Sequence, residues 1–197
     1  MTRGSRRVLV VGIASAALGI GGVAGAATEG GSQAPPKLSV GRAVGQTIIT
    51  GFSGRTPPAT LLSRIRDGHV GGVILFAGNT GGGQAQTLRL VRSLQAAAAT
   101  GHQPGLLVMT DQEGGSVRRL AGPPTLSASQ MTSPGLAGQQ GVATGRFLAA
   151  AGVNVDLAPV ADVRRNTNGF LAVEHRTFGS TASTVAARAC AFAKGVG

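Results

Sequence analysis

Aromatic residues and cysteine are scarce in this chain of 197 residues. It has no tryptophan or tyrosine and only six phenylalanines, so it offers few rings for stacking against nucleic-acid bases. Its single cysteine, Cys190, excludes an internal disulfide bond and a metal site built from cysteines. The alanine-rich surroundings of Cys190 predict a small core residue on a helix.

Acidic residues are also few: seven stand against 18 lysines and arginines, which gives a formal charge of +11. Such a charge favours anionic surroundings, for example wall polymers or nucleic acid. However, the basic residues are scattered and never occur more than two in a row. Together with the scarcity of aromatic rings, this argues against nucleic-acid binding.

The first 27 residues have the layout of an export signal. Three arginines, Arg3, Arg6 and Arg7, precede an uncharged run at 8–27 that ends in small residues. A cleaved signal peptide, by the Sec or the twin-arginine route, is therefore expected. An uncleaved membrane anchor is the alternative, which the glycines in the run disfavour. Residues 28–37 indicate a linker, so we expect an exported domain at 38–197 with no stable membrane span after cleavage.

From residue 38 onward the chain repeats a unit of apolar strand, polar loop and helix. The predicted strands are 45–52, 72–76, 106–109 and 153–158, and the predicted helices are 60–66, 84–100, 138–151 and 182–194. The continuous apolar run at 106–109 predicts a strand buried on both faces. The alternation indicates an α/β protein with a parallel sheet, either doubly wound or a (β/α)₈ barrel. A barrel needs about 250 residues, so four units make about half of one.

The strand at 106–109 runs into a polar turn that we expect at the ligand-binding end of the sheet. Asp111 and Glu113 are close enough in sequence to suggest a general acid–base pair, although a turn breaks the alternation of side chains. Asp111 is the favoured ligand contact, whereas Glu113 is better explained as a brace that pairs with an arginine. One of Arg118 and Arg119 is expected to form a fork to a carboxylate or to sugar hydroxyls, with the other outside the site.

The fourth predicted strand leads into a second loop at the same end of the sheet. Asp156 lies within this strand and is predicted to be structural, whereas Asp162 lies past its end on the functional face. Arg176 is placed to reach the pocket, and a role for His175 as a base is a weaker hypothesis.

Other polar segments of the sequence are weaker candidates for a functional site. His69 and His102 sit beside glycines at helix ends, where they are expected to act as C-terminal caps. The glycine-rich loop at 78–83 lacks the lysine of a phosphate-binding loop. The sequence has no histidine and carboxylate cluster with metal-ligand spacing and no G-x-S-x-G nucleophile elbow. We therefore expect no cofactor and no metal ion.

Four segments together resemble glycoside hydrolase family 3, in particular its bacterial β-N-acetylhexosaminidase branch. They are G-G-V-I-L-F at 71–76, T-D-Q-E-G-G-S-V-R-R at 110–119, N-V-D-L-A-P-V-A-D-V at 154–163 and R-T-F-G at 176–179. The resemblance covers about residues 40–197, and its D-Q-E-G-G-x-V-x-R element is specific. It implies a TIM-type (β/α)₈ barrel, of which about the first four βα units are present.

The resemblance also implies a reaction and a substrate site. Terminal N-acetylglucosamine would be hydrolysed from peptidoglycan fragments or chitooligosaccharides by a retaining mechanism with an aspartate nucleophile. The residue at the Asp111 position binds sugar hydroxyls in the family, and the arginines at the Arg119 and Arg176 positions line the same subsite.

The sequence lacks the segments that carry the catalytic residues of the family. The K-H-F-P-G-H-type element, the His/Asp acid–base pair and the late nucleophilic aspartate are all absent from residues 1–197. We therefore expect the N-terminal half of a barrel with no catalytic residue, a truncated chain that is inactive by itself. The alternative is a non-catalytic glycan-binding module of the cell envelope. An unrelated doubly wound protein is disfavoured by the order of the D-Q-E-G-G element.

Overall fold

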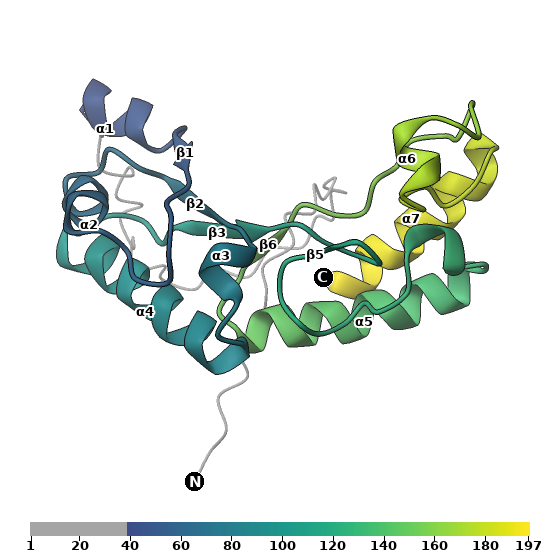
Figure 1. Cartoon of the computed structure of the whole chain (residues 1–197). Helices are drawn as coiled ribbons and strands as arrows, with labels where there is room; N and C mark the ends of the chain where they lie inside the picture. Colours follow the sequence, from purple (N-terminus) through teal and green to yellow (C-terminus); the bar gives the residue numbers. More distant parts are fainter. Residues whose placement is uncertain (1–38) are drawn as a thin grey trace, which may run out of the picture. The chain divides into compact units, whose positions relative to one another are not determined.

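A parallel sheet of four short strands organises the computed structural model, which describes residues 39–197 (Figure 1). Its strands are β1 (Ile49–Thr50), β2 (Gly72–Leu75), β3 (Leu107–Thr110) and β6 (Val155–Asp156), and they lie in the order β1-β2-β3-β6. The predicted leader at 1–27 and linker at 28–37 fall outside the described residues. Because neighbouring strands follow chain order without a reversal, the topology is that of a barrel rather than of a doubly wound sheet.

The remaining elements connect and cover these strands. The helices are α1 (Val40–Gly45), α2 (Ala59–Arg66), α3 (Ala77–Thr80), α4 (Gln84–Thr100), α5 (Pro134–Ala150), α6 (Phe170–Val173) and α7 (Ala182–Val196), with a 3₁₀ turn η1 at Ala128–Gln130. A hairpin of β4 (Gln112–Gly114) and β5 (Val117–Arg118) follows β3 directly. Within residues 39–197, no helix is both long and apolar enough to cross a membrane.

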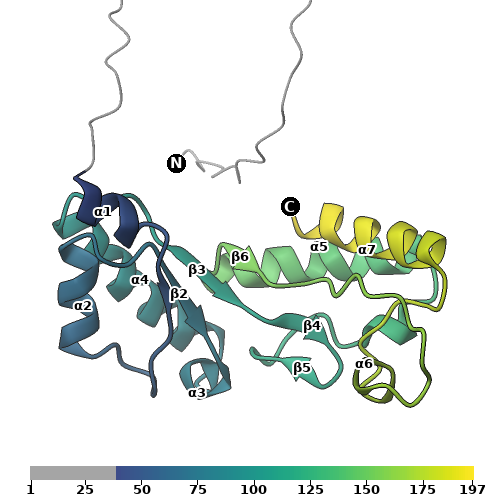
Figure 2. The ribbon, with the colours of Figure 1, turned by 90° about the horizontal axis from the view of Figure 1, so that it is seen from above.

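The two faces of the sheet differ in what covers them. Val73 and Val108, which are register partners, are fully buried in a cluster with side chains of α2, α4 and the end of α5. On the opposite face Ile49 and Leu107 remain 49% and 47% exposed. Figure 2 shows α2 and α4 together on one side of the strands. Helices outside and apolar side chains on the other face are the arrangement of a barrel wall, although the sheet is not closed within the described residues.

A second apolar cluster joins α5 to α7, which run side by side in both views (Figures 1 and 2). Phe178 and Phe192 are buried there, with ring centroids 6.5 Å apart. The helices approach closely because Gly141 has no side chain: a Cβ there would lie 2.2 Å from the carbonyl oxygen of Phe192. Ser133 and Thr181 cap the two helices by accepting the N–H groups of Leu136 and Thr184.

Several expectations from the sequence hold and others are wrong. The helix at 84–100 has the predicted bounds, and α2, α5 and α7 are each within a few residues of prediction. The strand expected at 45–52 is reduced to Ile49–Thr50, because α1 extends to Gly45 and a turn follows it, in which the N–H groups of Thr47 and Ile48 bond to the carbonyls of Val44 and Gly45. The strand β3 is buried on both faces at Val108 and Met109, as predicted, but Leu107 at its start is half-exposed.

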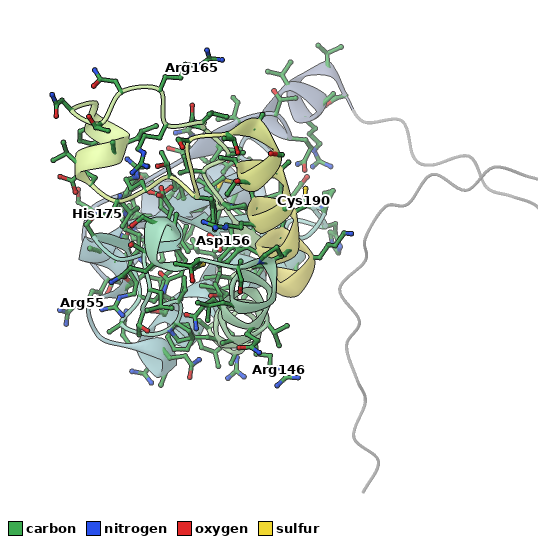
Figure 3. The ribbon with its side chains drawn as sticks, turned by 90° about the vertical axis from the view of Figure 1, so that its right-hand side faces the viewer. Arg55, Arg146, Asp156, Arg165, His175 and Cys190 are labelled. Carbon is green, nitrogen blue, oxygen red and sulfur yellow. The ribbon has the colours of Figure 1, made fainter. Side chains whose placement is uncertain are left out.

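The prediction for Cys190 is also wrong. This residue is on α7 as expected, but it is exposed. The buried stripe of α7 consists of Val185, Ala189 and Phe192, and Cys190 falls beside that stripe. Figure 3 shows it on the outer side of the helix.

Candidate functional site

Asp111 stands at the carboxyl end of β3, on the face of the sheet that no helix covers. Strand alternation places it on the same face as Leu107 and Met109. Its Oδ2 accepts hydrogen bonds from Nε and Nη2 of Arg119 at 3.2 and 3.1 Å. The backbone N–H of Arg119 also bonds to the carbonyl of Asp111 at 3.3 Å, so the two residues close the base of the hairpin. The predicted fork of an arginine on a carboxylate is therefore made by Arg119.

Glu113 lies two residues after Asp111, where the pairing of the two hairpin strands is irregular. Gln112 pairs with Arg118 and Gly114 pairs with Val117, so β4 carries one extra residue, a bulge that interrupts the alternation of side chains. Gly114 has a φ of 97°, and a Cβ there would lie 2.1 Å from the carbonyl oxygen of Leu126. Only glycine therefore allows the hairpin to lie this close to its neighbouring segment.

The bulge directs Glu113 to Arg176, 63 positions along the chain. Nε and Nη2 of Arg176 donate to the two carboxylate oxygens at 2.8 and 2.6 Å. This fork raises the pKa of Arg176 above its ordinary value, chiefly through the hydrogen bonds to Glu113. The guanidinium also lies 5.7 Å from the ring centre of Phe170. Glu113 is thus a brace paired with an arginine, the role favoured from the sequence.

Gln112, between the two acids, is a buried hub that the sequence analysis did not identify. Its amide nitrogen donates to the carbonyls of Leu120 and Pro123, both at 2.9 Å, and its Oε1 accepts the N–H of Leu120 at 3.0 Å. Its backbone N–H donates to Oδ1 of Asp156 on β6 at 3.0 Å. Its neighbours in the sequence are Asp111 and Glu113, so nothing in the polar turn marked it as a buried residue.

Asp156 has the structural position that its place in the fourth strand predicted. While Oδ1 accepts from Gln112, Oδ2 is buried without a hydrogen-bond partner among the described residues. Burial raises the pKa of Asp156 to about 7; the Gln112 N–H works against this shift, and the negative charges of Asp111 and Glu113 add to it. Figure 3 shows Asp156 in the interior of the side-chain view.

The structure thus brings Asp111, Arg119 and Arg176 to the same end of the sheet, with Glu113 and Asp156 beside them. The electrostatic influence of Asp111 on both Asp156 and Arg176 reflects this proximity. The other candidates lie apart from these pairs: Arg118 is exposed and bonds to the carbonyl of Gly122, while Asp162 and His175 are exposed and enter no side-chain hydrogen bond among the described residues.

The glycine-rich stretch at 78–83 is a support for the site rather than a phosphate loop. Its first residues belong to α3, and buried Asn79 donates to the carbonyls of Phe52 and Gly54 at 3.0 and 2.6 Å. The hydroxyl of Thr80 donates to the carbonyl of Arg119. The C-caps of α2 and α4 are Asp67 and Gly101 rather than the expected His69 and His102, which lie just beyond them and bond through their backbone N–H groups to the carbonyls of Arg64 and Ala99. Over residues 39–197, no group of three or more histidines, cysteines and carboxylates is placed to hold a metal ion.

Comparison with known families decides the assignment. Residues 41–197 match the model described as the glycosyl hydrolase family 3 N-terminal domain. The chain belongs to glycoside hydrolase family 3. Its sheet and helices are accordingly part of the TIM-barrel-type α/β fold of this family, which confirms the predicted fold class.

Individual family 3 relatives agree in sequence and in structure. A protein of Arthroderma benhamiae named as an uncharacterized secreted glycosyl hydrolase is 33% identical over 166 residues, 81% of this chain and 47% of its own length. A β-N-acetylglucosaminidase from a Paenibacillus species is 32% identical with a TM-score of 0.73, over 81% of this chain and 31% of that structure. The β-N-acetylhexosaminidase of Beutenbergia cavernae is 37% identical with a TM-score of 0.71, over 81% of this chain and 51% of that structure. The chain therefore spans about half of these relatives or less.

Proposed function

We propose that this family 3 chain binds the terminal N-acetylglucosamine of a glycan as part of a β-N-acetylhexosaminidase. Asp111, Arg119 and Arg176 are the proposed substrate-binding residues. The names of the Paenibacillus and Beutenbergia cavernae relatives support the activity, and both are more than 30% identical to this chain. The proposed substrates are amino-sugar oligosaccharides, either chitooligosaccharides or peptidoglycan fragments.

One observation carries the proposal: the two ion pairs do not use all the polar atoms of the three residues. Within residues 39–197, no hydrogen bond engages Oδ1 of Asp111, Nη1 of Arg119 or Nη1 of Arg176. A free carboxylate oxygen and two free guanidinium nitrogens offer one acceptor and two sets of donors to neighbouring hydroxyls. The ion pairs hold these groups in place before the sugar arrives, which lowers the entropy cost of binding.

Catalysis is assigned to segments that residues 1–197 do not contain. In the described site Asp111 and Glu113 are both paired with arginines, and Asp156 accepts the N–H of Gln112 with Oδ1 while its Oδ2 is buried. We propose that the site residues of this chain position the sugar, and that the 197-residue chain assayed alone binds without turnover. Export is proposed from the leader-like composition of residues 1–27 and from the secreted relative in Arthroderma benhamiae.

The test is a calorimetric titration of the 197-residue chain with N-acetylglucosamine. Asp111→Asn should weaken binding by about 10- to 100-fold, because it removes the negative charge and leaves a single oxygen to serve both Arg119 and the sugar. Asp67→Asn, an exposed acid at the end of α2, is the matched control and should bind as the unaltered chain does. Equal affinity of Asp111→Asn and the unaltered chain would refute the proposed sugar site.

A chromogenic N-acetylglucosaminide separates binding from hydrolysis. Hydrolysis by the 197-residue chain that Asp111→Asn abolishes would refute the prediction that this chain is inactive. Binding without hydrolysis is the expected result, and it is also what a glycan-binding module would give. Coexpression of the chain with a segment that carries the family's K-H-F-P-G element and late aspartate distinguishes the two, because only half of an enzyme should gain turnover.

A further inference from the structure

A cavity of about 400 Å³ lies at the tip of the β4–β5 hairpin, outside the site described so far. Its polar lining comes from three parts of the chain: the hairpin tip, the segment of η1 and the end of α6. The side chains that matter are Ser116, Ser127, Ser129, Gln130, Glu174 and His175. Its volume falls within the range of ligand pockets, about 300–1,000 Å³.

The lining has hydrogen-bonding capacity that the fold does not use. Oε1 of Gln130 accepts from the backbone and hydroxyl of Ser127, but its amide nitrogen enters no hydrogen bond among the described residues. The same holds for the side chains of Ser116, Glu174 and His175 within residues 39–197. Donors and acceptors are thus interspersed, which suits a ligand whose hydroxyl groups both donate and accept.

The charge of the lining restricts that ligand further. Although the chain has 18 lysines and arginines, none of them lines this cavity. The carboxylate of Glu174 is the only acidic group in the lining. Glu174 also interacts electrostatically with Arg176, but that guanidinium is already paired with Glu113 and does not line the cavity. Since like charges repel, the lining therefore disfavours a carboxylate or phosphate and favours an uncharged polar group.

The cavity is attached to the proposed sugar site through the Glu113–Arg176 pair. Glu113 precedes the hairpin tip by two residues, and Arg176 directly follows His175. The forked ion pair therefore holds the two walls together near the place where Arg176 presents its free nitrogen. The backbone N–H of Ser129 adds a second link by donating to the carbonyl of His175 at 3.2 Å.

We propose that this cavity binds the second sugar of the substrate and selects an uncharged residue there. This inference rests on the proposed function, in which the first sugar is held by Asp111, Arg119 and Arg176. It favours chitooligosaccharides over fragments in which N-acetylmuramic acid is the second unit, because the lactyl carboxylate of that sugar would meet Glu174. Gln130 and His175 are the proposed contacts for the hydroxyl and amide groups.

The test compares three ligands by calorimetry with the 197-residue chain: N-acetylglucosamine, N,N′-diacetylchitobiose and the disaccharide of N-acetylglucosamine with N-acetylmuramic acid. The chitobiose should bind about tenfold more tightly than the monosaccharide, the gain from one or two additional hydrogen bonds. The muramic disaccharide should show no such gain. Gln130→Ala should reduce chitobiose affinity to that of the monosaccharide while leaving monosaccharide binding unchanged.

Glu174→Gln isolates the charge. It should raise affinity for the muramic disaccharide by at least about fivefold, since one repulsive contact near a protein surface is removed. The affinity for chitobiose should change by less than about twofold, because glutamine can still accept a hydrogen bond from this uncharged sugar. Asp67→Asn should change the affinity for neither disaccharide. Equal affinity of the unaltered chain for the two disaccharides, or no response of chitobiose binding to Gln130→Ala, would overturn the inference.

The outcomes also separate this inference from the proposed function. If Asp111→Asn weakens all three ligands but Gln130→Ala weakens none, the terminal sugar site stands and the second subsite is refuted. If Gln130→Ala weakens chitobiose while Asp111→Asn has no effect, the cavity binds a sugar and the proposed terminal site is refuted.

Discussion

The two ion pairs of the hairpin use the same chemical groups in different ways. Arg119 places two of its three guanidinium nitrogens on one oxygen of Asp111, and the side chains are 31% and 22% exposed. Arg176 spans both oxygens of Glu113, and the exposed fractions are 21% and 8%. The first pair joins residues eight positions apart, whereas the second joins residues 63 positions apart.

Because of this difference, the Glu113–Arg176 pair supports the structure, whereas the Asp111–Arg119 pair can contact a ligand. A largely buried, two-oxygen fork fixes the loop before α7 against the hairpin, and both oxygens of the glutamate are already hydrogen-bonded to the arginine. The more exposed pair leaves one oxygen of Asp111 free and adds little stability, as partly solvated pairs do. The acid that contributes less to stability is therefore the one available for binding.

Removing the charge of Glu113 should destabilise the fold much more than removing the charge of Asp111. Glu113→Gln should lower the free energy of unfolding by about 3 kcal/mol, because Arg176 loses the carboxylate with which it forms its fork. Asp111→Asn should lower it by no more than about 1 kcal/mol. Urea denaturation followed by circular dichroism measures both. Similar losses in the two variants would show that the pairs do not differ in the way proposed.

Asp156 sharpens the comparison because its buried carboxyl group lies beside both acids. The pKa of Asp156 is raised to about 7 in the folded chain, whereas its ordinary value is 3.8. Between these two pH values the folded chain therefore keeps a proton on Asp156 that the unfolded chain releases. The contribution of Asp156 to stability is therefore complete below the unfolded pKa and is lost as the pH rises through 7.

Asp156→Asn should remove this pH dependence while it keeps an oxygen to accept the N–H of Gln112. The difference in unfolding free energy between the two chains should change by about 2 kcal/mol from pH 5 to pH 7, with the variant gaining relative to the unaltered chain. Denaturation curves at several pH values measure it. A difference that stays constant with pH would mean that Asp156 is ionised throughout this range.

The parts of the fold that depend on local sequence pattern could be predicted from the sequence. The helix at 84–100 has a regular apolar stripe and a glycine after it, and its bounds were predicted correctly. The roles of Asp156 as a structural residue and of Glu113 as a brace also followed from their places in a strand and a turn. The identity of the partner of Glu113 did not, because 63 residues separate it from Arg176 and only the folded loops bring them together.

Other features left too weak a signal in the sequence. In α7 alanines surround Cys190 on every side, so composition alone could not show which face is buried, although Val185 and Phe192 mark the stripe. The bonds of Gln112 to Leu120 and Pro123 depend on a turn whose path the sequence does not reveal. Likewise, the cavity at the hairpin tip unites segments that carry ordinary serines and a glutamine.

The adjacent arginines provide the finest comparison, since they have the same side chain and differ only in contacts. Arg119 bonds to Asp111 and its carbonyl accepts from Thr80, whereas Arg118 is exposed and makes one long bond, 3.3 Å, to the carbonyl of Gly122. Arg119→Ala should therefore lower the free energy of unfolding by about 1 kcal/mol, and Arg118→Ala should remain within about 0.5 kcal/mol of the unaltered chain. Because Arg119 also positions Asp111, only its variant should weaken N-acetylglucosamine binding in the calorimeter. If both variants weakened binding equally, the pair between Arg119 and Asp111 would have no special part in holding the sugar.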